Sequence, residues 1–228
     1  MTAPMTSFQE NRSVARYGDQ TKRLVPGLDD MHRMAGLLLA ETLDEAAHIL
    51  VLGAGGGQEL KAFADNSPSW RFLGVDPSTE MLELAKQVAS AHLGRIAFQE
   101  GTIEDAPAGP FDGATCLLTL HFLAPEDRLR TLIALRQRMR PGAPLIIAHH
   151  SFPQQEDDKA RWLGRFAAFA VSSGLSEDQA QRAVRSIGST LPILSPQDDE
   201  DLLREAGFDD VQLFYAAFTF RGWVAYAR

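Results

Sequence analysis

The sequence has little cysteine, an excess of acidic over basic residues, and no long hydrophobic run. Cys116 is the single cysteine among 228 residues, which excludes an internal disulfide and a cysteine-based zinc site. No apolar run reaches the roughly 18 residues that suggest a transmembrane helix, and the first residues lack the basic and apolar pattern of a signal peptide. We therefore expect a cytoplasmic protein that has no membrane partner.

The charge balance narrows the class of partner. Acidic residues number 30 against 22 basic ones, so the net charge is −8 and the pI is about 5.2. Such a balance argues against a broad basic surface for nucleic acid. A small molecule becomes the expected partner, and we expect a monomer or a homodimer. The length and the 45% hydrophobic content fit one α/β domain with an inserted or terminal cap.

The most informative stretch is ILVLGAGGG at residues 49–57. Its four apolar residues lead directly into a G-x-G-x-G turn, and a helical pattern begins at Gln58. A short apolar run ended by glycine is typical of a buried parallel strand. Glycines lack the Cβ atom that prevents a sharp turn or the close approach of a ligand. This order of strand, turn and helix predicts a nucleotide-type site.

A second strand, residues 71–75, ends at Asp76, about 20 residues after the glycine turn. A carboxylate at this point accepts hydrogen bonds from ribose hydroxyls in nucleoside-binding βαβ units. Pro77 and Ser78 then begin a helix that contains Met81. The pairing of the glycine turn with Asp76 favours nucleoside binding over a purely structural turn.

Further segments extend this pattern along most of the chain. They are QEGTIEDAP at 99–107, FDGATCLLTLHFL at 111–123, MRPGAPLIIAHH at 139–150 and AGF at 206–208. In order and spacing, the chain from residue 43 to its end resembles the class I S-adenosylmethionine-dependent methyltransferases. The resemblance implies an α/β, Rossmann-like sheet of seven mostly parallel strands, with helices on both faces, an antiparallel last strand and a helical cap. Dinucleotide enzymes share the first two segments, but their usual glycine spacing is G-x-G-x-x-G.

The resemblance also implies the cofactor, S-adenosylmethionine, with S-adenosylhomocysteine as its product. The residues that it implies as cofactor contacts are Gly53, Ala54, Gly55, Gly57, Asp76, Pro77, Ser78, Met81, Gly101, Thr102, Ile103, Leu118, Thr119 and, in the N-terminal segment, Tyr17.

Two positions depart from the family pattern. Thr102 stands where an acidic residue often accepts a hydrogen bond from the adenine amino group, and its hydroxyl can still accept one. Val51 stands where many members have an acidic residue that helps to bind the methionine ammonium. This ammonium is then left to backbone carbonyls around Gly53 or to the N-terminal segment.

We divide the chain into three parts on the same basis. Residues 1–42 form an N-terminal helical segment or lid, residues 43–151 and 197–228 form the cofactor-binding domain, and residues 152–196 form an inserted helical cap. The fourth strand is predicted over residues 111–120. Trp162, Phe166 and Phe169 repeat at helical spacing in the cap, and we expect them to form an apolar wall for the acceptor.

Three of the six histidines are candidate catalytic residues. His121 follows the fourth strand, and His149 and His150 end the fifth. Adjacent side chains on a strand point to opposite faces, so only one of this pair faces the site, and the pair cannot readily chelate one metal. We predict no metal site. A histidine of ordinary pKa can take a proton from an acceptor hydroxyl or amine. The remaining histidines, His32, His48 and His92, are interpreted as structural.

The expected activity is methyl transfer to a small-molecule acceptor by direct in-line displacement. The stretch RLVPGLDDM at 23–31 also looks like the corresponding part of carboxy-S-adenosylmethionine synthases, which modify the cofactor itself. Modification of the cofactor is therefore a second hypothesis. A regulatory protein that binds the cofactor without turnover is a third.

Overall fold

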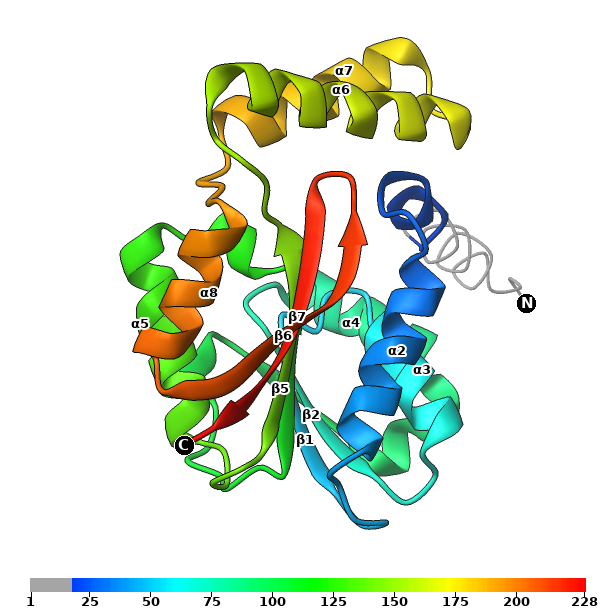
Figure 1. Cartoon of the computed structure of the whole chain (residues 1–228). Coiled ribbons are helices and arrows are strands. Elements are labelled where there is room, and N and C mark those ends of the chain that lie inside the picture. Colours follow the sequence, from blue (N-terminus) through cyan, green and yellow to red (C-terminus); the bar gives the residue numbers. More distant parts are fainter. Residues whose placement is uncertain (1–17) are drawn as a thin grey trace, which may run out of the picture.

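The computed structural model describes residues 18–228, and a seven-stranded sheet forms its centre (Figure 1). The strand order is β3-β2-β1-β4-β5-β7-β6. The strands are β1 (His48–Leu52), β2 (Arg71–Asp76), β3 (Ile96–Glu100), β4 (Gly113–Leu117), β5 (Pro144–His150), β6 (Phe208–Ala217) and β7 (Phe220–Ala227).

The sheet is mostly parallel. The pairs β3–β2, β2–β1, β1–β4 and β4–β5 are parallel, whereas β7 is antiparallel to both β5 and β6. This confirms the predicted fold, including the antiparallel last strand. The strand order reverses between β1 and β4, and open α/β sheets bind ligands at this kind of switch point, outside the carboxyl ends of the strands.

The apolar run of β1 follows from burial on both faces of the sheet. Ile49 and Val51 belong to one hydrophobic cluster, and Leu50 and Leu52 belong to the cluster on the other face. Alternate side chains of a strand point to opposite faces, so a central strand that is covered on both sides needs consecutive apolar residues.

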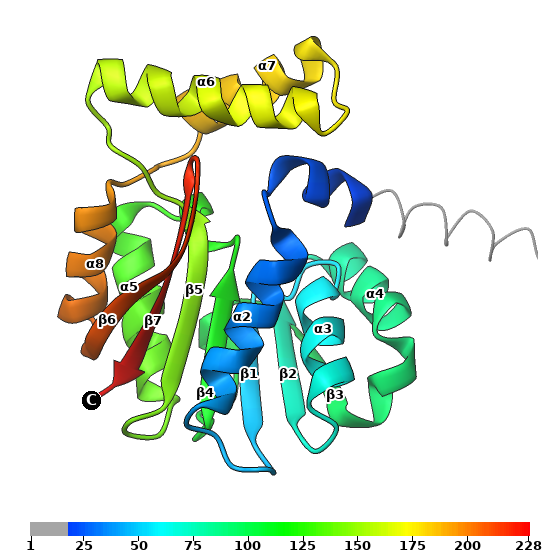
Figure 2. The ribbon, with the colours of Figure 1, turned by 45° about the vertical axis from the view of Figure 1, so that its right-hand side comes forward.

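Helices cover both faces (Figure 2). Helices α2, α3 and α4 lie together on one face, and α5 and α8 pack against each other on the other. The helices are α2 (Leu28–Ala40), α3 (Gln58–Asn66), α4 (Thr79–Val88), α5 (Pro125–Gln137), α6 (Glu156–Ser172), α7 (Glu177–Ser189) and α8 (Pro196–Glu205), with short 3-10 turns η1 (Ser90–Arg95), η2 (Ile103–Asp105) and η3 (Leu120–Phe122).

Helices α6 and α7 pack as a pair and form a cap above the carboxyl end of β5 (Figure 1). Ser176 begins α7 with a capping box in which its side chain and that of Gln179 bond each other's backbone amides. The tip of the β6–β7 hairpin reaches the cap, where the ring centroids of Phe218 in the hairpin and Phe169 in α6 lie 6.0 Å apart. Hairpin and cap are therefore in direct contact.

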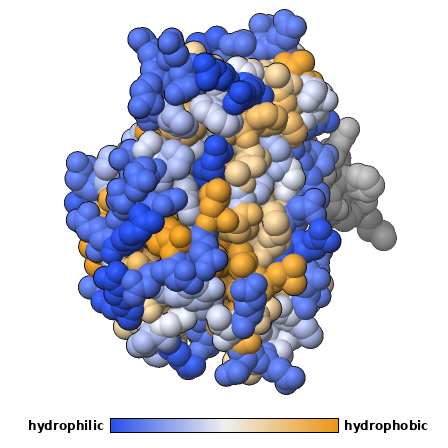
Figure 3. Space-filling view, in the orientation of Figure 1, coloured by the Kyte–Doolittle hydropathy of each residue, from blue (hydrophilic) through white to orange (hydrophobic). Residues whose placement is uncertain are grey.

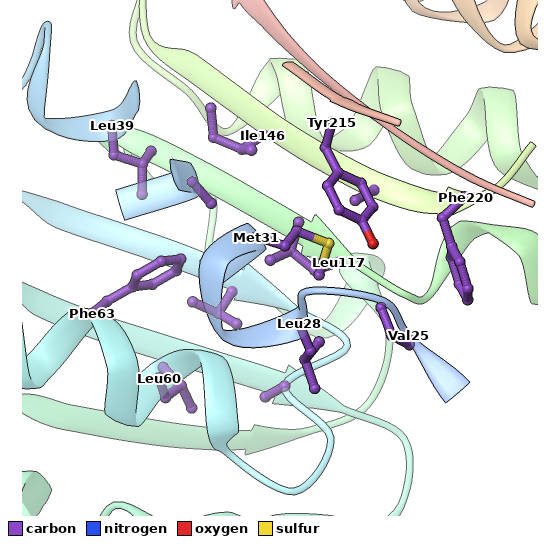
Figure 4. Packing of buried hydrophobic residues seen from close by; sticks show 14 of the residues in the cluster. Val25, Leu28, Met31, Leu39, Leu60, Phe63, Leu117, Ile146, Tyr215 and Phe220 are labelled. Atoms are coloured by element: carbon purple, nitrogen blue, oxygen red, sulfur yellow. The ribbon is translucent and has the colours of Figure 1, made fainter. Parts of the chain in front are cut away.

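Helix α2 and the segment that precedes it are both held against the core. Figure 4 shows Leu28 and Met31 of α2 on the buried side, near Leu117 and Tyr215. The Tyr215 hydroxyl donates a hydrogen bond to the carbonyl oxygen of Pro26 at 2.5 Å. This contact joins the hairpin to the segment that precedes α2.

The prediction for the fourth strand was too long. β4 ends at Leu117, and Leu118 takes a left-handed backbone conformation with φ 57°. A left-handed residue breaks the extended strand, and η3 follows from Leu120. Leu120 is therefore buried by a turn rather than by a strand, and Phe122 in the same turn is exposed.

The outer surface of the cap is largely hydrophilic, whereas hydrophobic side chains form a band across the front of the core beneath it (Figure 3). Among residues 18–228, no helix is long and apolar enough to cross a membrane.

Candidate functional site

The glycine turn between β1 and α3 has backbone angles that require glycine. Gly53, Gly55 and Gly57 have φ values of 75°, 48° and 78°. A Cβ atom on Gly53 would lie 2.0 Å from Thr119 Oγ1, and one on Gly57 would lie 2.6 Å from the Ala85 Cα. The turn therefore passes so close to η3 and α4 that side chains are excluded.

Asp76 organises the turn from the tip of β2. One carboxylate oxygen accepts the amide proton of Gly55 at 2.8 Å, and the other accepts that of Ser78 at 2.9 Å. The Ser78 side chain in turn accepts the amide proton of Met81 and caps α4. Each carboxylate oxygen has a further lone pair, so Asp76 can still accept hydrogen bonds from a ligand.

These elements enclose a cavity of about 400 Å³, called here the glycine-loop cavity. Its volume falls within the range of roughly 300 to 1,000 Å³ typical of small-molecule sites. Its walls combine backbone of the glycine turn, two carboxyl groups and apolar side chains of α2 and η3. They are Thr21, Leu28, His32, Gly53, Ala54, Gly55, Gly56, Gln58, Glu59, Asp76, Pro77, Met81, Leu117, Leu118, Thr119, Phe122 and Leu123.

Most of the predicted cofactor contacts come together in this cavity, but not all. Gly57 and Ser78 lie behind the wall as the N-caps of α3 and α4. Gly101, Thr102 and Ile103 do not line the cavity. The Thr102 hydroxyl donates a hydrogen bond to Glu104 at 2.7 Å. Tyr17 lies outside the residues that the structure describes.

A second cavity, of about 410 Å³, lies between the cap and the core and is called here the cap cavity. It shares Thr21, Leu118 and Phe122 with the glycine-loop cavity, so the two spaces adjoin. None of its described lining residues carries a full charge at neutral pH when its histidines are neutral. They are Gln20, Thr21, Leu24, Val25, Leu118, His121, Phe122, His150, Phe166, Ala183, Ser186, Ile187, Leu191 and Phe220.

Leu118 stands at the boundary between the two cavities in its left-handed conformation. A β-strand tip in this conformation is strained for any residue other than glycine, and such strain gathers at functional sites. The Leu118 amide donates to the carbonyl oxygen of Ala148 at 2.5 Å, which holds the turn to β5. This backbone geometry supports a functional boundary.

The adjacent histidines on β5 point in opposite directions. His150 faces the cap cavity, where its ring stacks on Phe220 at 4.0 Å. His149 lies on the other face, 3.2 Å from the Asp199 carboxylate and 5.6 Å from the Trp223 ring. Of the three candidate histidines, the structure brings His121 and His150 together, with ring centroids 4.9 Å apart.

Both histidines of the cap cavity are poor bases. Burial, followed by the charge of His149, lowers the pKa of His150 to about 3. Burial and the neighbouring histidines lower the pKa of His121 well below its usual range. The expectation of an ordinary histidine pKa is therefore wrong for both residues. The cause is desolvation, which disfavours the charged imidazolium.

Their hydrogen bonds also suggest a tautomer. The amide of His150 donates to Nδ1 of His121 at 3.3 Å. A neutral His121 that accepts at Nδ1 carries its proton on Nε2. His150 Nδ1 lies 3.0 Å from Thr219 Oγ1. His121 is therefore set to donate a hydrogen bond from Nε2.

Only one of the three aromatic residues predicted to form the acceptor wall lines the cap cavity. Phe166 does so. Trp162 instead contacts two guanidinium groups, and its ring centroid lies 4.6 Å from the Cζ atom of Arg165 and 5.0 Å from that of Arg221. Phe169 packs against the hairpin tip. Helical spacing correctly placed the three residues on one helix, α6, but the β6–β7 hairpin packs against Phe169, so Phe169 does not line the cap cavity.

A buried polar group lies on the far side of β5. Arg128 of α5 contacts Asp199 of α8 at 2.5 Å, and both side chains are at most 1% exposed. Arg128 also donates to the carbonyl oxygen of Pro192 at 3.0 Å, where the chain returns from the cap. Burial alone would raise the pKa of Asp199, but His149 and Arg128 hold it below its usual range. This group fixes the base of the cap.

Sequence reasoning missed two residues of the glycine-loop cavity. His32 was interpreted as structural, yet it lines the cavity, and burial lowers its pKa to about 4. Glu59 was not singled out, although it follows the glycine turn by two residues. Glu59 could have been identified from the sequence, because it is an acidic residue in the first turn of the helix predicted to follow the glycine turn.

Comparison with known proteins agrees with this geometry. Residues 49–142 match a family described as a methyltransferase domain. A carboxy-S-adenosyl-L-methionine synthase of Chromohalobacter salexigens is 28% identical over 224 residues, which cover 96% of this chain and 83% of the relative.

Two solved structures share the fold. The magnesium protoporphyrin IX methyltransferase of Synechocystis PCC 6803, with bound SAH, has a TM-score of 0.67 at 17% identity and covers 98% of this chain and 95% of its own. For human N-acetylserotonin methyltransferase in complex with SAM, the TM-score is 0.58 at 18% identity. The match covers 91% of this chain but only 56% of the human one. Taken with the sheet and the glycine-loop cavity, the family match and the relatives support a class I S-adenosylmethionine-dependent methyltransferase, with a methyltransferase domain at residues 49–142 and likeness to the carboxy-S-adenosyl-L-methionine synthases.

Proposed function

We propose that this enzyme transfers the methyl group of S-adenosylmethionine to a small, uncharged and largely apolar acceptor held in the cap cavity. The observation that carries this proposal is the contact between the two cavities. Thr21, Leu118 and Phe122 line both, so a donor in one lies next to an acceptor in the other. Positioning of this kind supplies much of the rate when two reactants are held in line.

The glycine-loop cavity fits the cofactor in shape and chemistry. Its glycine turn lines the cavity with backbone, and Asp76 keeps lone pairs for two ribose hydroxyls. The proposed contacts are Gly53, Ala54, Gly55, Asp76, Pro77, Met81, Leu118 and Thr119, and Gly57 and Ser78 shape the turn and the helix behind them. We assign no role to Gly101, Thr102 or Ile103, which lie outside the wall.

The bound cofactor supplies an activated sulfonium methyl group for an in-line displacement. His121 and His150 then act by orientation rather than by removing a proton, because bases of such low pKa accept protons poorly. His121 Nε2 donates a hydrogen bond to an oxygen or nitrogen of the acceptor. Phe166 and Phe220 cover the apolar part. These roles suit an uncharged acceptor whose nucleophilic atom, such as a ring nitrogen, carries a free lone pair and does not have to lose a proton before it attacks.

The cap and the N-terminal segment set the identity of the acceptor in this proposal. Gln20, Thr21, Leu24 and Val25 form one wall of the cap cavity. The Arg23 guanidinium donates to the carbonyl oxygen of Gly174 in the cap at 3.4 Å. We expect residues 152–196 and the segment before residue 26 to gain protection from hydrogen exchange when cofactor and acceptor bind. Unchanged exchange in both segments would contradict closure.

A second candidate function is modification of the cofactor itself, and the name of the Chromohalobacter relative favours it. A donor of a carboxyl group is itself anionic, and a buried anion needs a cationic or hydrogen-bonding partner. No lysine or arginine is among the described residues that line the cap cavity. Arg182 and Arg185 of α7 are exposed. The neutral wall therefore favours the uncharged acceptor.

Product analysis tests the two functions directly. Purified enzyme is incubated with S-adenosylmethionine and a panel of phenols, N-heterocycles and carboxylate donors, followed by mass spectrometry. We expect S-adenosylhomocysteine together with a methylated aromatic product. A carboxylated cofactor would establish the second function instead. Cofactor binding without any product in this panel or in a cell extract would favour the non-catalytic hypothesis.

The cap offers a matched pair of variants for the same assay. Phe166→Leu and Phe169→Leu change neighbouring aromatic residues of α6, but only Phe166 lines the cap cavity. We expect Phe166→Leu to raise the KM for the acceptor several-fold and Phe169→Leu to leave it unchanged. Equal effects would argue against the cap cavity as the acceptor site.

A further inference from the structure

Glu59 is a buried acid with no cationic partner. It lies in the first turn of α3, its residue is 6% exposed, and its side chain lines the glycine-loop cavity. The hydroxyl of Thr115 on β4 donates a hydrogen bond to Oε1. Among residues 18–228, no lysine, arginine or histidine pairs with Glu59, and Oε2 accepts no hydrogen bond. A buried carboxylate without a cation is costly, so such a group tends to stay neutral until a ligand provides the cation.

The position of Glu59 corresponds to the acidic residue that β1 lacks. Val51 pairs with Thr115 in the parallel ladder between β1 and β4. Paired residues of parallel strands project to the same face of the sheet, so the Thr115 hydroxyl lies beside the Val51 side chain. Glu59 reaches this hydroxyl from α3. Its carboxyl group therefore lies over the place that an acidic residue at position 51 would fill.

The sheet order separates the two acids of the cavity. Asp76 stands at the tip of β2, and the partner of Glu59 stands on β4, with β1 between them. A ligand that places its ribose on Asp76 and its sulfur at Leu118, the boundary with the cap cavity, has only its amino-acid end left to reach Glu59. This end carries an α-ammonium group.

We propose that Glu59 binds the α-ammonium group of the cofactor's amino-acid end. The inference rests on the proposed cofactor placement, and it replaces the sequence-based expectation that backbone carbonyls or the N-terminal segment hold this group. In this chain, α3 would supply through Glu59 the acidic group that β1 lacks at Val51.

The proposal predicts a coupling between binding and protonation. Burial raises the pKa of Glu59 to about 8, against a smaller lowering effect of the Thr115 hydrogen bond. The other titratable groups that line this cavity are His32 of α2 and Asp76 of β2, whereas the Cys116 thiol of β4 projects to the opposite face of the sheet. His32 is neutral above pH 6 because its pKa is about 4, and burial raises the pKa of the Cys116 thiol further above its usual range. Glu59 is therefore protonated in much of the free protein at pH 7.

An ammonium ligand binds the ionised form of Glu59. Below the free-state pKa, affinity should rise by up to about tenfold for each pH unit, with release of a proton on binding. S-adenosylhomocysteine has the ammonium group, whereas 5′-methylthioadenosine has the same nucleoside and thioether without it. Neither compound donates a methyl group, so the test is independent of the acceptor.

Calorimetry with both ligands, at pH 6.5 and 7.5 and in buffers of different ionisation enthalpy, measures affinity and proton release. For the unaltered protein we expect the S-adenosylhomocysteine affinity to rise several-fold between these pH values, with release of a proton, and the 5′-methylthioadenosine affinity to stay constant. Glu59→Gln, which keeps the size and polarity of the side chain, should bind S-adenosylhomocysteine at least tenfold more weakly at pH 7.5 and without the pH dependence. Its affinity for 5′-methylthioadenosine should not change.

Three outcomes would overturn the inference. One is an unchanged pH dependence in Glu59→Gln, and another is an equal loss of affinity for both ligands, which marks a structural role. The third is the absence of proton release in the unaltered protein, and this readout stands even if the variant does not fold. Failure to find a methylated product would leave all three readouts intact, so failure of the proposed methyl transfer is recognised separately.

Discussion

The two cavities have nearly equal volumes, about 400 and 410 Å³, but opposite chemistry. The glycine-loop cavity is built from backbone of a tight turn and from the carboxyl groups of Glu59 and Asp76. The cap cavity is lined by aromatic and aliphatic side chains and by two neutral histidines. Their sources also differ, because the first is built mainly from the ends of neighbouring parallel strands and the turns that follow them, whereas the second draws on six separate segments. These different walls suit the charged cofactor and the uncharged acceptor that we propose.

The largest expected effect tests whether the buried Arg128–Asp199 pair at the base of the cap stabilises the fold without affecting ligand binding in the glycine-loop cavity. Arg128→Ala leaves the Asp199 carboxylate buried without its partner, and we expect a loss of about 3 to 5 kcal/mol in the free energy of unfolding. Chemical denaturation measures this loss. Protein that remains folded should retain its affinity for S-adenosylhomocysteine.

The control for this change is Arg161→Ala, which removes an exposed pair with Asp158 in the cap. We expect at most about 1 kcal/mol from it. A comparable loss in both variants would mean that burial of the Arg128 group is not what stabilises the base of the cap.

The second effect breaks the glycine-loop cavity alone. Gly53→Val puts a branched side chain at φ 75°, where a Cβ atom would already meet Thr119. We expect S-adenosylhomocysteine affinity to fall at least 100-fold, or about 2.8 kcal/mol. Gly94→Ala, at a position with no atom within 4 Å of the added Cβ, is the control. Retained affinity in Gly53→Val would show that the turn does not approach the cofactor.

The third effect concerns Asp76. Removal of its carboxylate in Asp76→Ala takes away the acceptor for the ribose hydroxyls and for the Gly55 and Ser78 amides. We expect binding to weaken by about 1.5 to 3 kcal/mol, the usual range for hydrogen bonds to a charged group. Asp76→Asn keeps one acceptor oxygen, so its ligand affinity should lie between those of the unaltered protein and Asp76→Ala. Unchanged calorimetric affinity in Asp76→Ala would exclude the ribose contact.

The smallest expected effect is the pH dependence of stability that results from the lowered pKa of His32 in the glycine-loop cavity, which parallels the lowered pKa values of the histidines in the cap cavity. His32 has a folded-state pKa of about 4 and an ordinary value of 6.5 when unfolded, so only the unfolded chain takes up the proton between these values. Stability is therefore lost as pH falls from 6.5 towards 4. Between pH 7.5 and 6, His32 should account for about 0.8 kcal/mol of this loss.

The variant His32→Gln should show a correspondingly smaller loss, whereas the contributions of His121 and His150 in the cap cavity remain. Denaturation curves at both pH values give the difference. Identical pH slopes for His32→Gln and the unaltered protein would contradict a buried, neutral His32.

The local sequence determined the parallel strands, the glycine turn and the Asp76 position. A strand buried on both faces must be continuously apolar, and a turn with positive φ at three positions favours glycine, so each requirement leaves a mark within a few residues. The fold and most of the glycine-loop cavity were predictable for this reason. The cofactor contacts themselves stay a prediction.

Tertiary structure alone decided the rest. Leu118 ends β4 through contact with β5, and His149 and His150 take opposite faces, only one of which meets the cap. The hairpin tip takes Phe169 away from the cavity, and Glu59 reaches Thr115 from a different element. Each of these outcomes depends on distances between residues far apart in the chain. Burial then sets the pKa values of His121, His150 and Glu59, and desolvation is a property of the packed surroundings that no local pattern encodes.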